Sequence, residues 1–435
     1  MGVLVLAAVV GVVASVAAWG FLELVHYTTV WVYTDLPKDL GYDKAPQWWS
    51  LPVLAIAGIL VALAIERLPG RGGHIPAEGL SAGLIGPNEL PGVILAALAS
   101  IGLGVVLGPE APLLALGGGL GVLTIRMLRS DAPAEVGTLL GASGAFAALS
   151  FLFGSPLIAA VIMIEATGLG GPRLPVVLLP GLLAAGIGWM VSHGMGSWTG
   201  LNTSDISLSL LPLPAFGRPD FLEFVWTIPL AVAVAVGTFV IFRLARESQR
   251  LAEWKPFIVL PAIGLAVSGL AIAFSEATGK SVNEVLFSGE TTVNGLIEGS
   301  ASWSLSALAL LIAFKGVAYG LSLGSFRGGP AFPAIFLGTA AGLMAGQLPG
   351  FSITPAVAVG VGAATVAVLR LPLSAIVLAT LLTAKSGAGA GPLIIVGVVV
   401  AYLTVTFISR SPGADPARAG GGEADPGAPA VAAPT

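Results

Sequence analysis

The sequence predicts an all-helical protein that crosses a membrane many times. Three observations support this fold class: 56% of the 435 residues are hydrophobic, only 10% are charged, and apolar runs recur from one end of the chain to the other. About 25% of the residues of a soluble domain are charged, so this chain has too few charges to cover a globule in water. Lipid must therefore surround most of it.

Composition also excludes several classes of protein. A net charge of −4 gives no basic field for holding nucleic acid, and the absence of Cys excludes disulfides, Fe–S clusters and thiolate zinc sites. The three His are scattered without metal-ligand spacing. We find no phosphate-binding loop and no Gly-x-Ser-x-Gly elbow. We therefore expect neither an enzyme nor a bound cofactor.

About fourteen apolar runs follow one another along the chain. The first has no Lys or Arg before Lys38, so we interpret it as a retained membrane helix and not as a secretion signal. A straight spanning helix needs about 20 residues. The runs that approach or exceed this length are Met1 to Val25, Leu51 to Leu68, Leu90 to Leu107, Phe221 to Phe242, Pro256 to Phe274 and Leu305 to Leu321.

Other apolar runs are too short to cross a bilayer. Examples are Leu113 to Ile125, Pro156 to Ile164 and Leu373 to Leu382, each bounded by Gly, Pro or a charge. Broken helices are tolerated at membrane depth only where their free backbone groups are buried in protein or line a polar cavity. The pattern is therefore typical of a transport protein.

The charges indicate how the chain is oriented and where its membrane part ends. The densest basic cluster is Arg243, Arg246, Arg250 and Lys255, around a predicted polar loop at Glu247 to Lys255, which the positive-inside rule places in the cytoplasm. We expect a multi-pass domain of the cell membrane over residues 1–410. Residues 411–435 are rich in Pro, Gly and Ala, and we expect a disordered tail there with no folded regulatory domain.

A weak internal repeat divides the membrane domain into a first half, about 1–195, and a second half, about 220–410. Gly141 to Ala166 and Gly362 to Ala384 each contain a small-residue helix, a break with a Pro, and a second apolar helix. A Gly/Pro loop precedes each copy, LGPEAP (Leu107 to Pro112) and GGPAFP (Gly328 to Pro333). Broken helices at matching places in two halves indicate a binding site at the repeat interface.

Three Gly/Pro segments open helices: GGHIPAEGL (Gly72 to Leu80), LGPEAPLLALGGG (Leu107 to Gly119) and SFRGGPAFPAIFLG (Ser325 to Gly338). A helix start presents free N–H groups and a positive dipole end, and Gly allows a ligand to approach the backbone. The alternative is that Gly and Pro only kink packed helices. Because three such segments occur, two of them in matching repeat positions, we favour an anion site.

Among ionisable residues, Glu110 is the strongest candidate. It opens an apolar helix, where its carboxylate would occupy the place that an anion prefers, so it could act as a gate. The alternative role is simple stabilisation by the helix dipole. Glu165 either takes part or ends a helix near the interface, and Lys315 either attracts anions or pairs structurally. For His74 we favour a structural role over a polar lining.

At these residues the sequence resembles the CLC family of chloride channels and anion/proton exchangers, over nearly the whole membrane part. GGHIPAEGL is similar to the family's Gly-Ser-Gly-Ile-Pro-Glu pattern, LGPEAP to Gly-Lys/Arg-Glu-Gly-Pro, and FKGVAYGLSLGSFRGGPAFP to its Gly-Gly-x-Phe-x-Pro segment. The resemblance implies an inverted repeat of tilted and partial-depth helices, a likeness to voltage-gated chloride channels, and a homodimer with one anion path per subunit. Glu110 falls on the gating glutamate. The anion-binding positions that it implies are Gly73, His74, Ile75, Gly108, Pro109, Ala111, Ala331 and Phe332.

The sequence also departs from the family pattern. Gly73 stands where the family has a pore Ser, no Tyr occurs near Lys385 to Pro392 although Ser386 could supply a hydroxyl, and Pro330 lacks a backbone N–H. Ala166 stands where proton-coupled members often carry Glu. We expect a channel or transporter for chloride or a similar small monovalent anion. Two alternatives stay open: a chloride/proton antiporter, with protons as a second partner, and an unrelated secondary transporter for an organic substrate.

Overall fold

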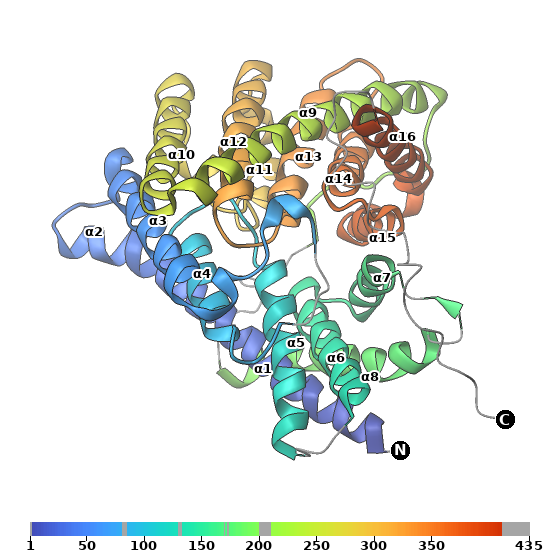
Figure 1. The fold of residues 1–435 in the computed structure, drawn as a ribbon. Coiled ribbons are helices and arrows are strands. Elements are labelled where there is room, and N and C mark those ends of the chain that lie inside the picture. The colour runs from blue at the N-terminus through green and yellow to red at the C-terminus, as the bar shows by residue number, and fades with distance from the viewer. Residues whose placement is uncertain are drawn as a thin grey trace.

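The computed structural model describes residues 2–80, 85–128, 133–168, 170–171, 174–199 and 210–410. The predicted tail at 411–435 lies outside the described residues. Within these ranges every regular element is a helix, which confirms the predicted all-helical fold (Figure 1).

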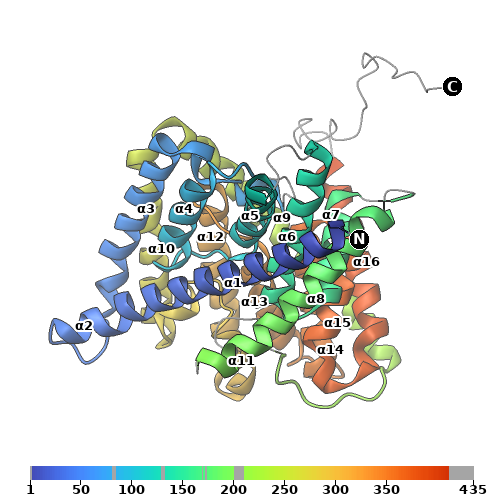
Figure 2. The ribbon, with the colours of Figure 1, turned by 90° about the horizontal axis from the view of Figure 1, so that it is seen from below.

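The first part of the chain forms eight α-helices. They are α1 (Gly2–Val30), α2 (Leu36–Asp39), α3 (Ser50–Arg67), α4 (Leu90–Ile101), α5 (Glu110–Leu128), α6 (Ala134–Phe153), α7 (Pro156–Thr167) and α8 (Leu174–Thr199). Figure 2 shows α1 and α8 running side by side and obliquely across the molecule, and the two helices pack against each other. Such tilted helices are expected of the predicted fold class.

The second part of the chain forms eight more. They are α9 (Phe221–Trp254), α10 (Pro256–Thr278), α11 (Val293–Glu298), α12 (Leu305–Ser325), α13 (Ala331–Ala345), α14 (Ile353–Leu369), α15 (Pro372–Leu382) and α16 (Gly391–Arg410). In the described ranges, nine helices are long and apolar enough to cross a membrane, and five are shorter apolar helices of 10–17 residues. These helices match the predicted number of apolar runs.

Three predicted boundaries were wrong. The run from Leu90 ends as a helix at Ile101, because Gly104 turns the backbone with φ +98° and begins an irregular segment that leads to Glu110. The run at Leu113 to Ile125 belongs to the 19-residue α5, which starts three residues earlier and continues three residues further. All of the predicted polar loop at Glu247 to Lys255 except its last residue belongs to α9, where Arg250 and Glu247 pair across one turn at 2.8 Å.

The internal repeat is visible in the backbone. Gly154 follows the last residue of α6 and Arg370 follows that of α14, both in the left-handed conformation with φ +60°, and the next helix begins at a Pro in each half. Glycines let α5 approach α6 closely, and they do the same for α13 and α14. Side chains at Gly117 and Gly144 would overlap the backbone between α5 and α6, and side chains at Gly338 and Gly360 would do so between α13 and α14. The same packing device thus positions α5 and α13.

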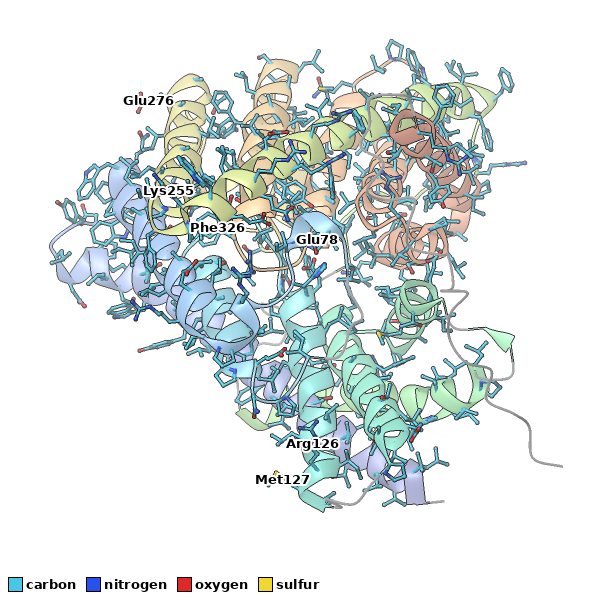
Figure 3. All side chains as sticks on the ribbon, in the orientation of Figure 1. Glu78, Arg126, Met127, Lys255, Glu276 and Phe326 are labelled. Carbon is cyan, nitrogen blue, oxygen red and sulfur yellow. The ribbon has the colours of Figure 1, made fainter. Side chains whose placement is uncertain are left out.

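The ends of the helices define two opposite faces of the molecule. Lys255 and Glu276 mark the two ends of α10, while Arg126 and Met127 project from the end of α5 that is remote from Glu110 (Figure 3). Near the basic end of α9, the side-chain amide of Gln249 donates to Glu78 Oε1 at 3.3 Å. The Gly72 to Leu80 segment therefore lies on the same face as the basic cluster, and the segment between α10 and α12 lies on the opposite face.

Candidate functional site

The two repeat halves meet at a pair of glycines that precede α5 and α13. Gly108 N–H donates to Gly329 O at 2.8 Å, and Gly329 N–H donates to Gly108 O at 2.5 Å. Pro109 and Pro330 follow these glycines and lead into the two helices. The reciprocal hydrogen bonds hold the N-termini of α5 and α13 beside each other in the interior of the protein.

Glu110 occupies the space between these helix ends. It is 1% exposed, and its Oε1 accepts a hydrogen bond of 2.7 Å from the backbone N–H of Phe332. The backbone N–H groups of Ala331 and of Glu110 itself also stabilise the carboxylate. Its Oε2 has no hydrogen-bond partner among the described residues. The carboxylate therefore binds at the positive end of α13, as a small anion would.

The neighbouring glycines are required by this arrangement. A Cβ at Gly329 would overlap Glu110 Oε2, and a Cβ at Gly108 would lie 2.7 Å from Oε1 and closer still to Oε2. Phe332 stacks its ring on Phe153 with centroids 5.8 Å apart, and Tyr319 donates its hydroxyl to Pro330 O at 2.5 Å. Packing on several sides thus fixes the start of α13.

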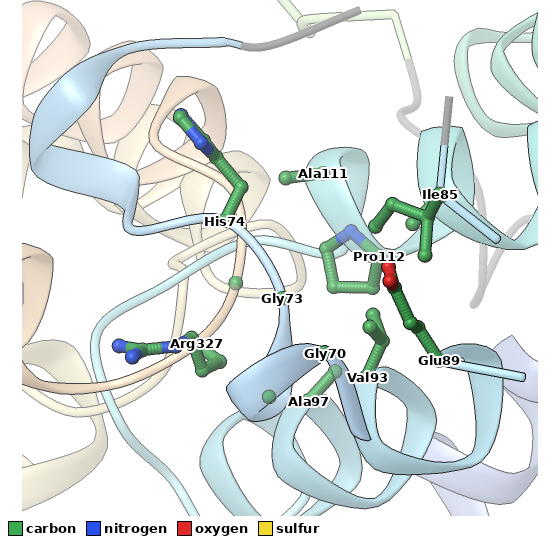
Figure 4. Close-up of a pocket in the computed structure, with 13 residues that line it drawn as sticks. Gly70, Gly73, His74, Ile85, Glu89, Val93, Ala97, Ala111, Pro112 and Arg327 are labelled. Carbon is green, nitrogen blue, oxygen red and sulfur yellow. The ribbon is translucent and has the colours of Figure 1, made fainter. Parts of the chain in front are cut away.

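A cavity of about 290 Å³ leads to this site and brings the three Gly/Pro segments together. Gly73 and His74 come from the first segment, Ala111 and Pro112 from the first turn of α5, and Arg327 and Gly328 from the third (Figure 4). Ile75 lines an adjoining cavity of about 360 Å³ together with Glu78, Glu253 and Arg327. Both cavities lie on the face that carries the basic end of α9.

Arg327 is a buried cation between the two cavities. It is 7% exposed, and its Nη1 donates to Phe326 O at 3.2 Å. Its side chain packs across Gly72, and in Figure 4 the guanidinium extends away from Glu89 and Pro112. Burial lowers the pKa of Arg327 to about 10, so the group stays charged at neutral pH. It supplies positive potential at the inner mouth of the site.

Other predicted residues lie apart from Glu110 or are engaged elsewhere. The His74 ring bonds Gly79 O at 2.9 Å and also lines the two cavities. Glu165 accepts from the backbone N–H groups of Leu373 and Ser374 at 2.9 and 2.7 Å, so it caps α15 from the end of α7. Ser386 donates its hydroxyl to Thr383 O at 2.7 Å, beside α15.

Lys315 is fully buried, and its ammonium donates to the carbonyls of four consecutive residues, Glu284 to Phe287, at 2.9 to 3.2 Å. It also lies over the ring of Phe336, 4.4 Å from the centroid. Of the two roles considered for Lys315, this geometry favours the structural one. Its ammonium fixes the segment between α10 and α12 against the membrane part.

Sequence reasoning missed Arg327, Tyr319 and Glu290. The first two lie within the motif segment from Phe314 to Pro333, where a charge beside two glycines was the available signal for Arg327. Glu290 lies in a segment that the sequence presents only as a polar loop. Its place beside α13 follows from the fold, because the preceding Gly289 lies against the ring of Phe336.

An inverted repeat of broken helices, whose paired N-termini meet in the interior at the end of a cavity, defines a multi-pass membrane transport protein. A family model described as voltage gated chloride channel matches residues 78–406, so the chain belongs to that family.

Several sequence relatives carry the name "Putative ion-transport protein YfeO". The one from Escherichia coli O1:K1 is 28% identical over 336 residues, and the one from Shigella boydii serotype 4 is 27% identical over 336 residues, each match covering 76% of both chains. A slow cyanobacterial Cl−/H+ antiporter has a similar structure, with a TM-score of 0.72, 22% identity, and coverage of 94% of this chain and 95% of its own. A CLC-type fluoride/proton antiporter gives a TM-score of 0.68 at 17% identity, covering 93% and 96%. The two solved structures support the fold.

Proposed function

We propose that this protein moves chloride or a similar small anion across the membrane, with Glu110 as the gate. The observation that carries the proposal is the hydrogen bond from Phe332 N–H to Glu110 Oε1, at 2.7 Å. A carboxylate and a small anion compete for the same helix N-terminus, so only one of them can occupy it. When the Glu110 side chain is protonated or swings away, the N–H group becomes available to the anion.

The surroundings of this site suit weak and reversible binding. The anion would meet backbone N–H groups at the start of α13, while Arg327 attracts it from the neighbouring cavities without forming part of that helix end. Conduction requires binding that is favourable enough for entry and weak enough for release. Because Gly73 supplies no hydroxyl and Pro330 no N–H, the site has fewer donors than the resemblance implies.

Exchange of the anion for a proton is the second candidate. The observation that favours it is Glu110 Oε2, a buried carboxylate oxygen without a hydrogen-bond partner among the described residues, which could accept a proton. Ala166 favours uncoupled transport instead, since it offers no carboxylate after Glu165. A reversal potential measured under crossed chloride and pH gradients distinguishes the two: a channel follows chloride alone, and an exchanger responds to both gradients.

The test of the proposal is anion efflux from liposomes that contain the purified protein. Chloride, nitrate and fluoride are loaded separately, and wild-type efflux is compared with that of Glu110→Gln and of empty liposomes. We expect efflux of at least one of these anions, with a pH dependence that Glu110→Gln weakens. The matched control is Glu135→Gln, which changes an exposed acid in the first turn of α6. Efflux of all three anions at the empty-liposome rate would favour a transporter for an organic substrate.

The family resemblance also supports a homodimer with one anion path in each subunit and no cofactor. Multi-angle light scattering of the purified protein in detergent tests the assembly, with the mass of two chains as the expected result. The mass of one chain would contradict it. Transport by protein that was purified and reconstituted without any added cofactor tests the second point.

A further inference from the structure

The segment between α10 and α12 is held firmly against the core from two sides. Lys315 donates to its carbonyls from Glu284 to Phe287, and Phe287 N–H donates to Gly104 O at 3.0 Å. Gly104 belongs to the irregular stretch that leads from α4 to Glu110. This segment, on the face opposite the basic end of α9, is thereby tied to the stretch that positions the Glu110 carboxylate.

Glu290 follows this anchored part directly. The preceding Gly289 lies against the ring of Phe336, with which a Cβ there would overlap, and Phe336 is one turn along α13 from Phe332. The Glu290 side chain is half-buried, and its Oε1 is enclosed with no hydrogen-bond partner in the described part of the chain. One side of the residue therefore reaches solvent while one oxygen faces the interior.

Glu290 and Glu110 complement each other. Burial, and then the neighbouring charge of Glu110, raises the pKa of Glu290 to about 8, so Glu290 holds a proton at neutral pH. A protonated carboxyl group is a hydrogen-bond donor, and Glu110 Oε2 is a buried acceptor with no donor among the described residues. Protonated Glu290 can donate the hydrogen bond that Glu110 Oε2 can accept.

We propose that Glu290 is a proton-binding residue that passes protons between the solution on its face of the membrane and Glu110. This inference rests on the proposed gating by Glu110. In the transfer, the O–H bond of Glu290 breaks and an O–H bond forms on Glu110, which becomes neutral while Glu290 becomes a carboxylate. A hydronium ion from the solution then restores the proton of Glu290. The neutral Glu110 binds the positive start of α13 more weakly and yields it to the anion.

The other charged and titratable groups around Glu290 have different tasks. Lys315 of α12 is engaged by backbone carbonyls, and Lys280 donates to Ser302 O at 3.2 Å. Burial raises the pKa of Glu284, on the same segment, against the charges of Lys315 and Lys280. Tyr33, in the π-helical turn Trp31–Asp35 that follows α1, donates its hydroxyl to Leu103 O at 2.8 Å, and α13 presents the uncharged Phe336. None of these groups is an acid on another element. The acid on another element whose charge raises the pKa of Glu290 is Glu110, on α5.

The experiment measures chloride efflux from liposomes at a series of pH values, kept equal on both sides. If the rate follows the protonated fraction of Glu290, it falls about tenfold from one pH unit below its pKa to one unit above. We therefore expect a wild-type fall centred near pH 8, which Glu290→Gln abolishes. The matched control is Glu298→Gln, an exposed acid of the same segment, which should keep the wild-type profile.

The outcomes separate this inference from the proposed function. If Glu290→Gln keeps the wild-type profile while Glu110→Gln loses it, Glu290 carries no proton and the gate stands. If Glu110→Gln also keeps the wild-type profile, the proposed gate itself is wrong. Should Glu290→Gln fail to give monodisperse protein, Glu290→Asp is measured: a fall that moves to another pH supports the relay, and an unchanged midpoint contradicts it.

Discussion

Replacing Gly329 with alanine should force the Glu110 carboxylate away from α13 while leaving its charge in place. A Cβ at this position would overlap Glu110 Oε2, and it would also lie 2.6 Å from the carboxyl carbon. Gly329 does not have a positive φ, so alanine meets no backbone strain of its own there. The methyl group would also lie 2.9 Å from the backbone N of Glu110, so it displaces the carboxylate and presses on the first turn of α5.

The size of the effect follows from the hydrogen bond that is lost. A bond from a neutral donor to a charged acceptor contributes about 1.5–3 kcal/mol. Losing the bond from Phe332 N–H to Glu110 Oε1 would thus shift the equilibrium between the closed and vacated positions by roughly 10- to 150-fold. If vacating the site limits transport, the chloride flux rises toward the rate of a protein without a gate.

The assay is chloride efflux from liposomes at fixed pH, with Glu110→Ala as the ungated reference. Gly329→Ala should approach the rate of Glu110→Ala, and adding it to Glu110→Ala should change little, because the displaced atoms are then absent. Gly237→Ala is the control, since a Cβ there has no atom within 4 Å. Monodisperse Gly329→Ala protein with wild-type efflux and pH dependence would refute the placement of the carboxylate.

Three further predictions concern residues around the gate. Glu165→Gln should lower the free energy of unfolding by about 1 kcal/mol, because it weakens the cap of α15. The melting temperature in detergent should fall while the pH profile of efflux stays unchanged; an altered pH profile with an unchanged melting temperature would contradict this. Lys315→Met should cost about 3 kcal/mol or more, because it leaves buried carbonyls without a donor, and melting at the wild-type temperature would argue against the anchoring role. Arg327→Gln should raise the chloride concentration for half-maximal efflux several-fold, since it removes a buried positive charge from both cavities. An unchanged concentration dependence would exclude Arg327 from anion recruitment.

Composition and the breaks in the apolar runs predicted most of the fold. The Pro at each break and the small residues before it predicted α6 with α7 and α14 with α15, because Pro is favoured at the first position of a helix. The end of α9 was less readable. Its last turns are charged, which resembles a loop in sequence, yet pairs such as Arg250 with Glu247 suit a helix that extends beyond the membrane.

The candidate site was readable only in part. Glu110 stood out because an acid between apolar runs needs an explanation. Two of the three Gly/Pro segments correctly predicted helix starts, those of α5 and α13. The prediction was wrong for Gly72 to Leu80, which forms only a three-residue 3-10 turn at Pro76–Glu78, because Gly73 and Gly79 on either side of it have positive φ. The pairing of Gly108 with Gly329 joins positions 221 residues apart, which no local pattern specifies. Glu290 and Arg327 depend in the same way on contacts between distant segments, and Glu165 contacts a helix of the other half.

The central claim is that the Glu110 carboxylate and a small anion compete for the N-terminus of α13. Isothermal titration of purified protein with chloride at neutral pH tests this most directly, because it measures occupancy of the site without requiring transport. Glu110→Gln should bind chloride more tightly than the wild type, on the order of tenfold, since a neutral side chain competes less well. Equal chloride affinity of the wild type and Glu110→Gln would contradict it.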